Sequence, residues 1–132
     1  MKNKKFIKIA KDVINLEIKA LEKLKKNLND SFNKAVLEIS KCQSKIILCG
    51  VGKSGIIASK IAATLSSVGS PSFYLSASDS SHGDLGSISK KDILILISNS
   101  GQTKELRNII QFANRNKNIT LIGIVSKKNS LL

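Results

Sequence analysis

The sequence predicts an α/β protein with an open, doubly wound parallel sheet between two layers of helices, a three-layer αβα arrangement. Short aliphatic runs alternate with helix-like segments from residue 45 onward, and polar loops follow three of those runs. Strands that alternate with helices are joined by right-handed crossovers, which gives a parallel sheet covered on both faces. A chain of 132 residues has the size of one such domain.

Residues 1–44 are predicted to form an N-terminal helical segment. Apolar residues from Phe6 to Leu28 recur every three or four positions, which is the spacing of one helical stripe. Asp30 or Ser31 is expected to cap a second, shorter helix, "FNKAVLEISKC". Charges interrupt the apolar residues throughout, so the N-terminus is neither a signal peptide nor a membrane span. We expect these helices to pack alongside the sheet of a cytoplasmic protein.

The remaining elements follow in order. The run "KIILCGV" (45–51) predicts a buried strand, and "SGIIASKIAATLSSVG" predicts a helix closed by Gly69. Pro71 opens the strand "SFYL", and "DILILISN" (92–99) is the least ambiguous strand. It leads into the helix "KELRNIIQFANRNK" and a last strand, "ITLIGIV" (119–125). Because another crossover would normally follow, we expect a domain that is C-terminally incomplete.

Composition limits the partners. The formal charge is +13, but every cation except Arg107 and Arg115 is lysine, and no aromatic residues interleave with them. Nucleic-acid binding relies on clustered cations and stacking platforms, so no nucleic-acid partner is expected. Cys42 and Cys49 form neither a CxxC pair nor a zinc set, which is typical of reduced cytosolic thiols. No residues have the spacing of metal ligands.

Three polar loops follow predicted strands: "GVGKSG" (50–55), "SASDSSHGDLG" (76–86) and "SNSGQT" (98–103). Ligands of open α/β sheets bind at the carboxyl ends of the strands, so the loops define one rim. The first loop is not a nucleotide loop. Ile47 stands where a Walker A loop needs its first glycine, and no acidic residue follows at the Rossmann position near residue 72.

The second and third loops carry the candidate chemistry. Ser98, Ser100 and Thr103 place three hydroxyls around one glycine, which suits the three oxygens of a monoester phosphate. Helix capping is the alternative, and it would explain one hydroxyl. His82 is the only histidine, and Glu105 lies near the start of the third helix, where the dipole favours an ionised carboxylate. Both are candidates for proton transfer.

Four stretches resemble a known family in their order and spacing: "GVGKSG", "ATLSSVGSPSFYL", "HGDLG" and "ISNSGQTKEL". They are similar to the sugar isomerase (SIS) domain of the bacterial arabinose-5-phosphate isomerases, and the resemblance spans nearly the whole chain. It implies a flavodoxin- or Rossmann-like SIS domain over residues 45–132. It also implies a homotetrameric, cofactor-free isomerase of D-ribulose 5-phosphate and D-arabinose 5-phosphate, on the route to the Kdo sugar of lipopolysaccharide.

The resemblance also implies site residues. The substrate-binding set would be Gly52, Ser54, Ser98, Asn99, Ser100, Gln102 and Thr103. The catalytic set would be Lys53, His82 and Glu105. In an aldose–ketose isomerisation through an enediolate, Lys53 would stabilise the oxyanion, and Glu105 or His82 would act as the base or move hydroxyl protons. Which of the two is the base stays open.

The sequence departs from the family's pattern at two places. Gln102 stands where these proteins often have glutamate. The family's domain also continues beyond the position of Leu132, with a further catalytic glutamate and histidine and then a pair of CBS domains. Two alternatives therefore remain: a non-catalytic, sugar-phosphate-binding regulatory module, and a truncated remnant. The isomerase is the leading interpretation because all three loops agree with it.

Overall fold

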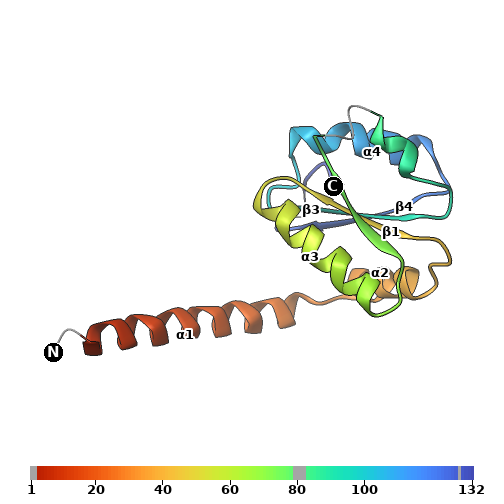
Figure 1. Cartoon of the computed structure of the whole chain (residues 1–132). Helices are drawn as coiled ribbons and strands as arrows, with labels where there is room; N and C mark the ends of the chain where they lie inside the picture. Colours follow the sequence, from red (N-terminus) through yellow and green to blue (C-terminus); the bar gives the residue numbers. More distant parts are fainter. Residues whose placement is uncertain (1–2, 79–82, 128) are drawn as a thin grey trace. The chain divides into compact units, whose positions relative to one another are not determined.

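The computed structural model describes residues 3–78, 83–127 and 129–132. The chain divides between Lys34 and Ala35 into two compact units (Figure 1). The first unit contains the long helix and the start of the second. The elements are α1 (Asn3–Asn27), α2 (Asp30–Ser40), β1 (Ile46–Gly50), α3 (Lys53–Ser67), β2 (Ser72–Ser76), η2 (Asp84–Ser87), β3 (Ile93–Ser98), η3 (Lys104–Leu106), α4 (Arg107–Arg115) and β4 (Thr120–Val125).

The second unit is built on a four-stranded parallel sheet in the order β2-β1-β3-β4. Helix α3 covers one face of this sheet and α4 covers the other (Figure 1). The chain leaves β1 toward β2 and later returns to place β3 on the opposite side of β1. The predicted α/β class with a doubly wound parallel sheet is confirmed. The switch in winding direction lies between β1 and β3.

The aliphatic strands supply the core because the sheet is covered on both faces. Every residue of β1 is buried. Ile47 and Cys49 belong to the cluster under α4, whereas Ile46 and Leu48 belong to the cluster under α3. Side chains alternate between the faces of a strand, so a strand buried on both sides is apolar throughout. Each fully buried Ile or Leu contributes about 1.5–3 kcal/mol.

Two local predictions need correction. The side-chain oxygen of Asn29, not that of Asp30 or Ser31, caps α2 by accepting from the Ser31 amide at 2.9 Å. The predicted helix after residue 103 begins with the single 3₁₀ turn η3, in which the Leu106 amide donates to the Thr103 carbonyl at 3.2 Å. The second polar loop contains another short 3₁₀ helix, η2.

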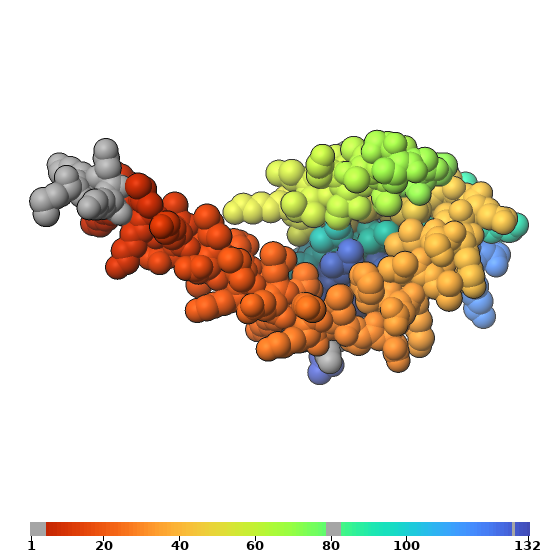
Figure 2. All heavy atoms as spheres, turned by 90° about the horizontal axis from the view of Figure 1, so that it is seen from below, coloured from red at the N-terminus to blue at the C-terminus, as the bar shows by residue number. Residues whose placement is uncertain are grey.

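The helices leave apolar side chains at the surface. In Figure 2 the side chains of α3, drawn in yellow-green, form an uninterrupted outer surface of the second unit. Ile56 and Ile57 are exposed on this helix. Helix α1, taken alone, exposes apolar side chains along its whole length. Within the part of the chain that the structure describes, none of the helices is both long and apolar enough to cross a membrane.

Candidate functional site

The rim predicted from the sequence forms at the carboxyl ends of the strands. Gly50, the last residue of β1, is in register with Ile97 of β3, and Ser98 ends β3. The loop after β1 and the loop after β3 therefore start side by side at the point where the winding direction switches. In open α/β sheets this crevice is where ligands bind. We call these segments the first loop (50–55) and the third loop (98–103).

The first loop is a strand-to-helix turn that needs glycine for close packing. A Cβ atom on Gly50 would lie 2.8 Å from the carbonyl carbon and oxygen of Ser54. A Cβ atom on Gly55 would lie 2.8 Å from both the Gly50 carbonyl oxygen and the Tyr74 hydroxyl oxygen. That hydroxyl reaches across from β2 and donates to the Gly50 carbonyl at 3.1 Å. The start of α3 is thereby held directly against the end of β1.

The amino end of α3 is open to an anion. Gly52 precedes the helix with φ 58°, a left-handed conformation that favours glycine, and no side chain caps the helix. The first amides of a helix have no partner within it, and the helix dipole makes this end attractive to anions. Lys53 is exposed and Ser54 is half-buried at this end. The residues predicted here can therefore supply backbone N–H groups, one hydroxyl and one ammonium group.

The third loop holds itself together through its own hydroxyls. The buried Ser98 Oγ lies 2.7 Å from Thr103 Oγ1 and accepts a hydrogen bond from the Gly101 amide at 3.0 Å. Ser100 Oγ accepts from the Gln102 amide at 3.2 Å. Thr103 precedes η3 without making a side-chain cap. Capping therefore does not explain the Thr103 hydroxyl, which is used inside the loop.

The other predicted residues vary in placement. Asn99, Ser100 and Gln102 are exposed in the third loop. Glu105 is also exposed, but it lies in η3, before α4 begins, and not two residues into an α-helix. Its carboxylate is therefore not within the first turn of α4, where the sequence had placed it. His82 falls outside the described residues.

Two perturbed groups lie away from the rim's polar side chains. Burial raises the pKa of the Cys49 thiol to about 12, although a hydrogen bond with the Gly50 backbone lowers it in part. A thiol with this pKa stays protonated, so Cys49 is not a nucleophile. Asp92 is buried at the opposite end of the sheet. Among the described residues, no three His, Cys, Asp or Glu side chains come together in a way that would hold a metal ion.

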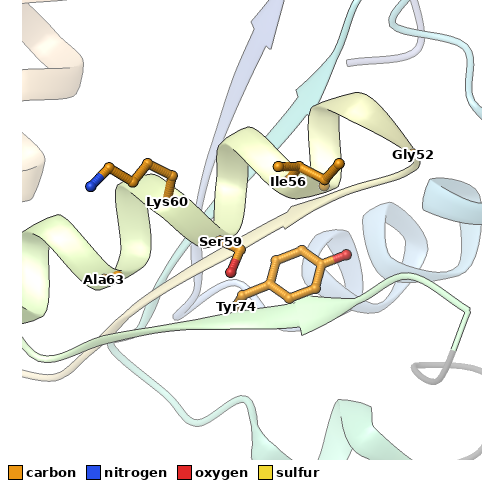
Figure 3. A pocket seen from close by; sticks show the side chains of 7 residues that line it. Gly52, Ile56, Ser59, Lys60, Ala63 and Tyr74 are labelled. Carbon is orange, nitrogen blue, oxygen red and sulfur yellow. The ribbon is translucent and has the colours of Figure 1, made fainter.

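A hollow of about 440 Å³ adjoins the first loop (Figure 3). It lies beside α3 and the edge strand β2, and its lining residues are Gly52, Gly55, Ile56, Ser59, Lys60, Ala63 and Tyr74. It contains no residue of the third loop. This hollow was not predicted from the sequence, because it forms only when α3 packs beside Tyr74 of β2.

Comparison with known proteins relates this chain to sugar-phosphate isomerases in sequence. A family model described as SIS domain matches residues 38–132. An uncharacterized protein of Rickettsia prowazekii is 48% identical over 94% of this chain and 39% of its own length. The arabinose 5-phosphate isomerase of Francisella tularensis is 40% identical over 93% of this chain and 38% of its own length. The chain thus spans less than two fifths of these curated relatives.

A solved structure is similar over the full chain. It is a protein of Escherichia coli CFT073 in complex with arabinose 5-phosphate, with a TM-score of 0.91 and 39% sequence identity. The match covers 100% of this chain and 70% of the solved one. The likeness therefore includes the first and third loops as well as the sheet.

Proposed function

Because this chain belongs to the SIS domain family, we propose that it binds a pentose 5-phosphate and serves an isomerase that interconverts D-ribulose 5-phosphate and D-arabinose 5-phosphate. One observation carries the proposal: the hydroxyl-rich third loop and the open amino end of α3 follow adjacent strands at one crevice. The similarity to relatives named arabinose 5-phosphate isomerase, and to a structure in complex with that sugar phosphate, supports the choice of sugar.

The phosphate would be held mainly by the third loop. A monoester phosphate presents three acceptor oxygens and therefore needs donors. The Ser98 and Thr103 hydroxyls lie 2.7 Å apart, so one of them donates to the other and only the second keeps a hydrogen to direct elsewhere. The exposed side chains of Ser100, Asn99 and Gln102, the Ser54 hydroxyl and backbone amides near Gly52 would supply the remaining donors. No metal or cofactor is needed for this binding.

The chemistry would be a proton transfer between neighbouring carbons. A base removes the proton from C1 of ribulose 5-phosphate, and an enediolate forms. A proton returns to C2, and the hydroxyl proton of O1 is transferred to O2, which gives the aldose. The Lys53 ammonium group would stabilise the negative oxygen of the enediolate. Glu105 and His82 are the two candidates for the base. The sugar product would serve Kdo and lipopolysaccharide synthesis, and the two free cysteines agree with a cytoplasmic location.

Assembly into a homo-oligomer, a tetramer by family resemblance, is part of the proposal. At 3.6 residues per turn, the apolar side chains of α1 spread over about half of its circumference. They are exposed in the single chain: Phe6, Ile7, Ile9, Val13, Ile14, Leu16, Ile18, Leu21 and Leu24. A two-helix coiled coil needs only a narrow stripe, whereas a wider arc suits a helix that packs against several others. Copies of this chain would supply those helices.

The direct test uses the full-length protein and ribulose 5-phosphate without added metal. We expect arabinose 5-phosphate to form, and we expect Lys53→Ala to lower kcat by about 100- to 1,000-fold, as loss of one oxyanion-stabilising group does. Lys90→Ala is the control, because Lys90 is an exposed lysine in the turn before β3, at the opposite end of the sheet. Absence of turnover in the wild type would exclude the isomerase. If sugar phosphate still binds and Lys53→Ala changes only its affinity, the regulatory module is favoured.

A further inference from the structure

The chain beyond β4 returns over the third loop. The Ser126 amide and the Ser126 hydroxyl both donate to the Asn99 carbonyl oxygen, at 3.3 Å and 2.5 Å. Farther on, the amides of Leu131 and Leu132 donate to the Gly101 carbonyl oxygen, at 3.1 Å and 3.3 Å. Two of the loop's carbonyl groups are therefore fixed from outside the loop, and the hydroxyl of Ser126 is the side-chain donor among these contacts.

These bonds set the direction of a loop amide. Val125 pairs with Ser98, so Ser126 approaches Asn99 from the β4 side of β3. The described part of the chain contains no cis peptide bond, and in a trans peptide the carbonyl and the following N–H point in opposite directions. With the Asn99 carbonyl held toward β4, the N–H of Ser100 points toward β1 and the crevice. Among the residues that the structure describes, none accepts from this N–H.

We propose that Ser126 is a positioning residue that aims the Ser100 amide at the phosphate of the substrate. The inference rests on the proposed function. Any residue except proline would keep the backbone bond at this position, but at 3.3 Å it is longer than a typical N–H···O bond. The hydroxyl supplies the second, shorter bond, and the carbonyl oxygen has two lone pairs to receive both. Without the hydroxyl, the Asn99–Ser100 peptide is held by one long bond and turns more freely.

The test compares three variants of the full-length protein: Ser126→Ala, Ser126→Thr and Ser67→Ala. Ser67 is the matched control, since its exposed hydroxyl bonds to Thr64 at the other end of α3. The dissociation constants of arabinose 5-phosphate and inorganic phosphate are measured by calorimetry. Ser126→Ala is expected to weaken both by about three- to tenfold, the worth of one hydrogen bond. Ser126→Thr, which keeps a hydroxyl, should retain most of the affinity, and Ser67→Ala should bind like the wild type.

Two further readouts separate positioning from general damage. At saturating substrate, kcat should change less than twofold while KM rises, because the lost contact serves the bound ground state and the transition state alike. Hydrogen exchange of the peptide covering residues 98–103 should rise in Ser126→Ala and not in Ser67→Ala.

The outcomes distinguish this inference from the proposed function. If the wild type binds neither arabinose 5-phosphate nor inorganic phosphate, both fail. If the wild type binds them and Ser126→Ala binds equally well, the role of Ser126 is overturned while the proposed function stands. The role is also overturned if Ser67→Ala weakens binding as much as Ser126→Ala does.

Discussion

The two ends of the sheet use polar residues in opposite ways. At the amino end, the carboxylate of Asp92 is fully buried and accepts hydrogen bonds from the Ser44 hydroxyl and the Ser89 amide, both at 2.6 Å. Lys45 Nζ lies 2.8 Å from the same carboxylate. These contacts join residues just before β1 to the turn before β3. At the carboxyl end, by contrast, most of the predicted site residues that the structure describes are exposed: Gly52, Lys53, Asn99, Ser100, Gln102 and Glu105.

The difference separates stability from binding. A buried charge is tolerated only when it is paired and hydrogen-bonded. The Asp92 carboxylate meets this condition through groups of the chain itself, so its contacts stabilise the fold. Exposed donors at the carboxyl end contribute little to stability and remain available to a ligand. Changes at the amino end should therefore reduce the free energy of unfolding and leave phosphate affinity alone. Changes at the carboxyl end should weaken phosphate affinity, and they should reduce the free energy of unfolding only where the side chain is at least half-buried, as Thr103 is.

The largest effect is expected from Asp92→Ala. It leaves the Ser44 hydroxyl and the Ser89 amide without their acceptor and Lys45 without its anion, and breaking a buried pair of this kind costs about 3 kcal/mol. Urea unfolding would measure the loss. Calorimetry with arabinose 5-phosphate should give an unchanged dissociation constant. Lys45→Met and the double variant complete a cycle, and additive losses would show that the two residues do not act as a pair.

Low pH should remove the stabilisation that the ionised Asp92 carboxylate contributes to the fold. Burial by itself would raise the pKa of Asp92, but the hydrogen bonds from Lys45, Ser44 and Ser89 and the charge of Lys45 outweigh it and hold the pKa below the ordinary value of 3.8. A lowered folded-state pKa stabilises the protein above the unfolded-state pKa, and this stabilisation is lost as pH falls through the folded-state pKa.

The measurement is urea unfolding of the wild type and Asp92→Asn from pH 7 to pH 3. The difference in unfolding free energy should be constant above about pH 5 and should shrink as pH falls past 3.8. A difference that grows on acidification would contradict the assignment, because it would require a raised pKa. The amide keeps the shape of the side chain and cannot titrate, so it isolates the charge.

Thr103→Val tests the carboxyl end with a smaller effect. The substitution keeps the shape of the side chain and removes the partner of the Ser98 hydroxyl, which retains its bond from the Gly101 amide. We expect a loss of about 1 kcal/mol in unfolding free energy and a three- to tenfold weaker affinity for arabinose 5-phosphate. Each effect corresponds to the loss of about one hydrogen bond. Thr64→Val, on the exposed side of α3, is the matched control and should leave the affinity unchanged. A stability loss without any affinity loss would break the contrast between the ends.

Much of the fold could be predicted because its signals are local. The aliphatic run of β1 is buried along its length, and that of β3 is buried except for the half-buried Ile97. Gly69 follows α3 with φ 92°, the left-handed conformation that commonly ends a helix. The loop sequences identified the rim because strand ends of a parallel sheet lie along one edge. The cap of α2 was assigned wrongly because Asn29, Asp30 and Ser31 are all good capping residues in sequence.

The remaining features depend on contacts between distant residues. Nothing near Asp92 in the sequence indicates that Ser44 and Lys45 will lie against it, because the register of β1 and β3 brings them together. The contact between Ser126 and Asn99 likewise arises only when β4 pairs with β3. The third-loop hydroxyls were predicted as phosphate ligands, but their bonds to one another follow from the loop's bend at Gly101, with φ 66°.

The smallest expected effect comes from the turn that leads into β3. Lys91 has φ 72°, a left-handed conformation in which a side chain is strained, and its amide donates to the Asn118 carbonyl at 2.7 Å. Lys91→Gly removes a strain of about 1–2 kcal/mol and keeps the amide that bonds to Asn118. Because glycine also makes the unfolded chain more flexible, we expect a net increase of about 0.5–1 kcal/mol in the free energy of unfolding. The neighbouring Lys90→Gly should instead lose about that much in urea unfolding, because Lys90 has no left-handed strain to relieve. If both variants lost stability, relief of left-handed strain at Lys91 would be smaller than the added entropy of the unfolded chain, and the expected gain in unfolding free energy would be refuted.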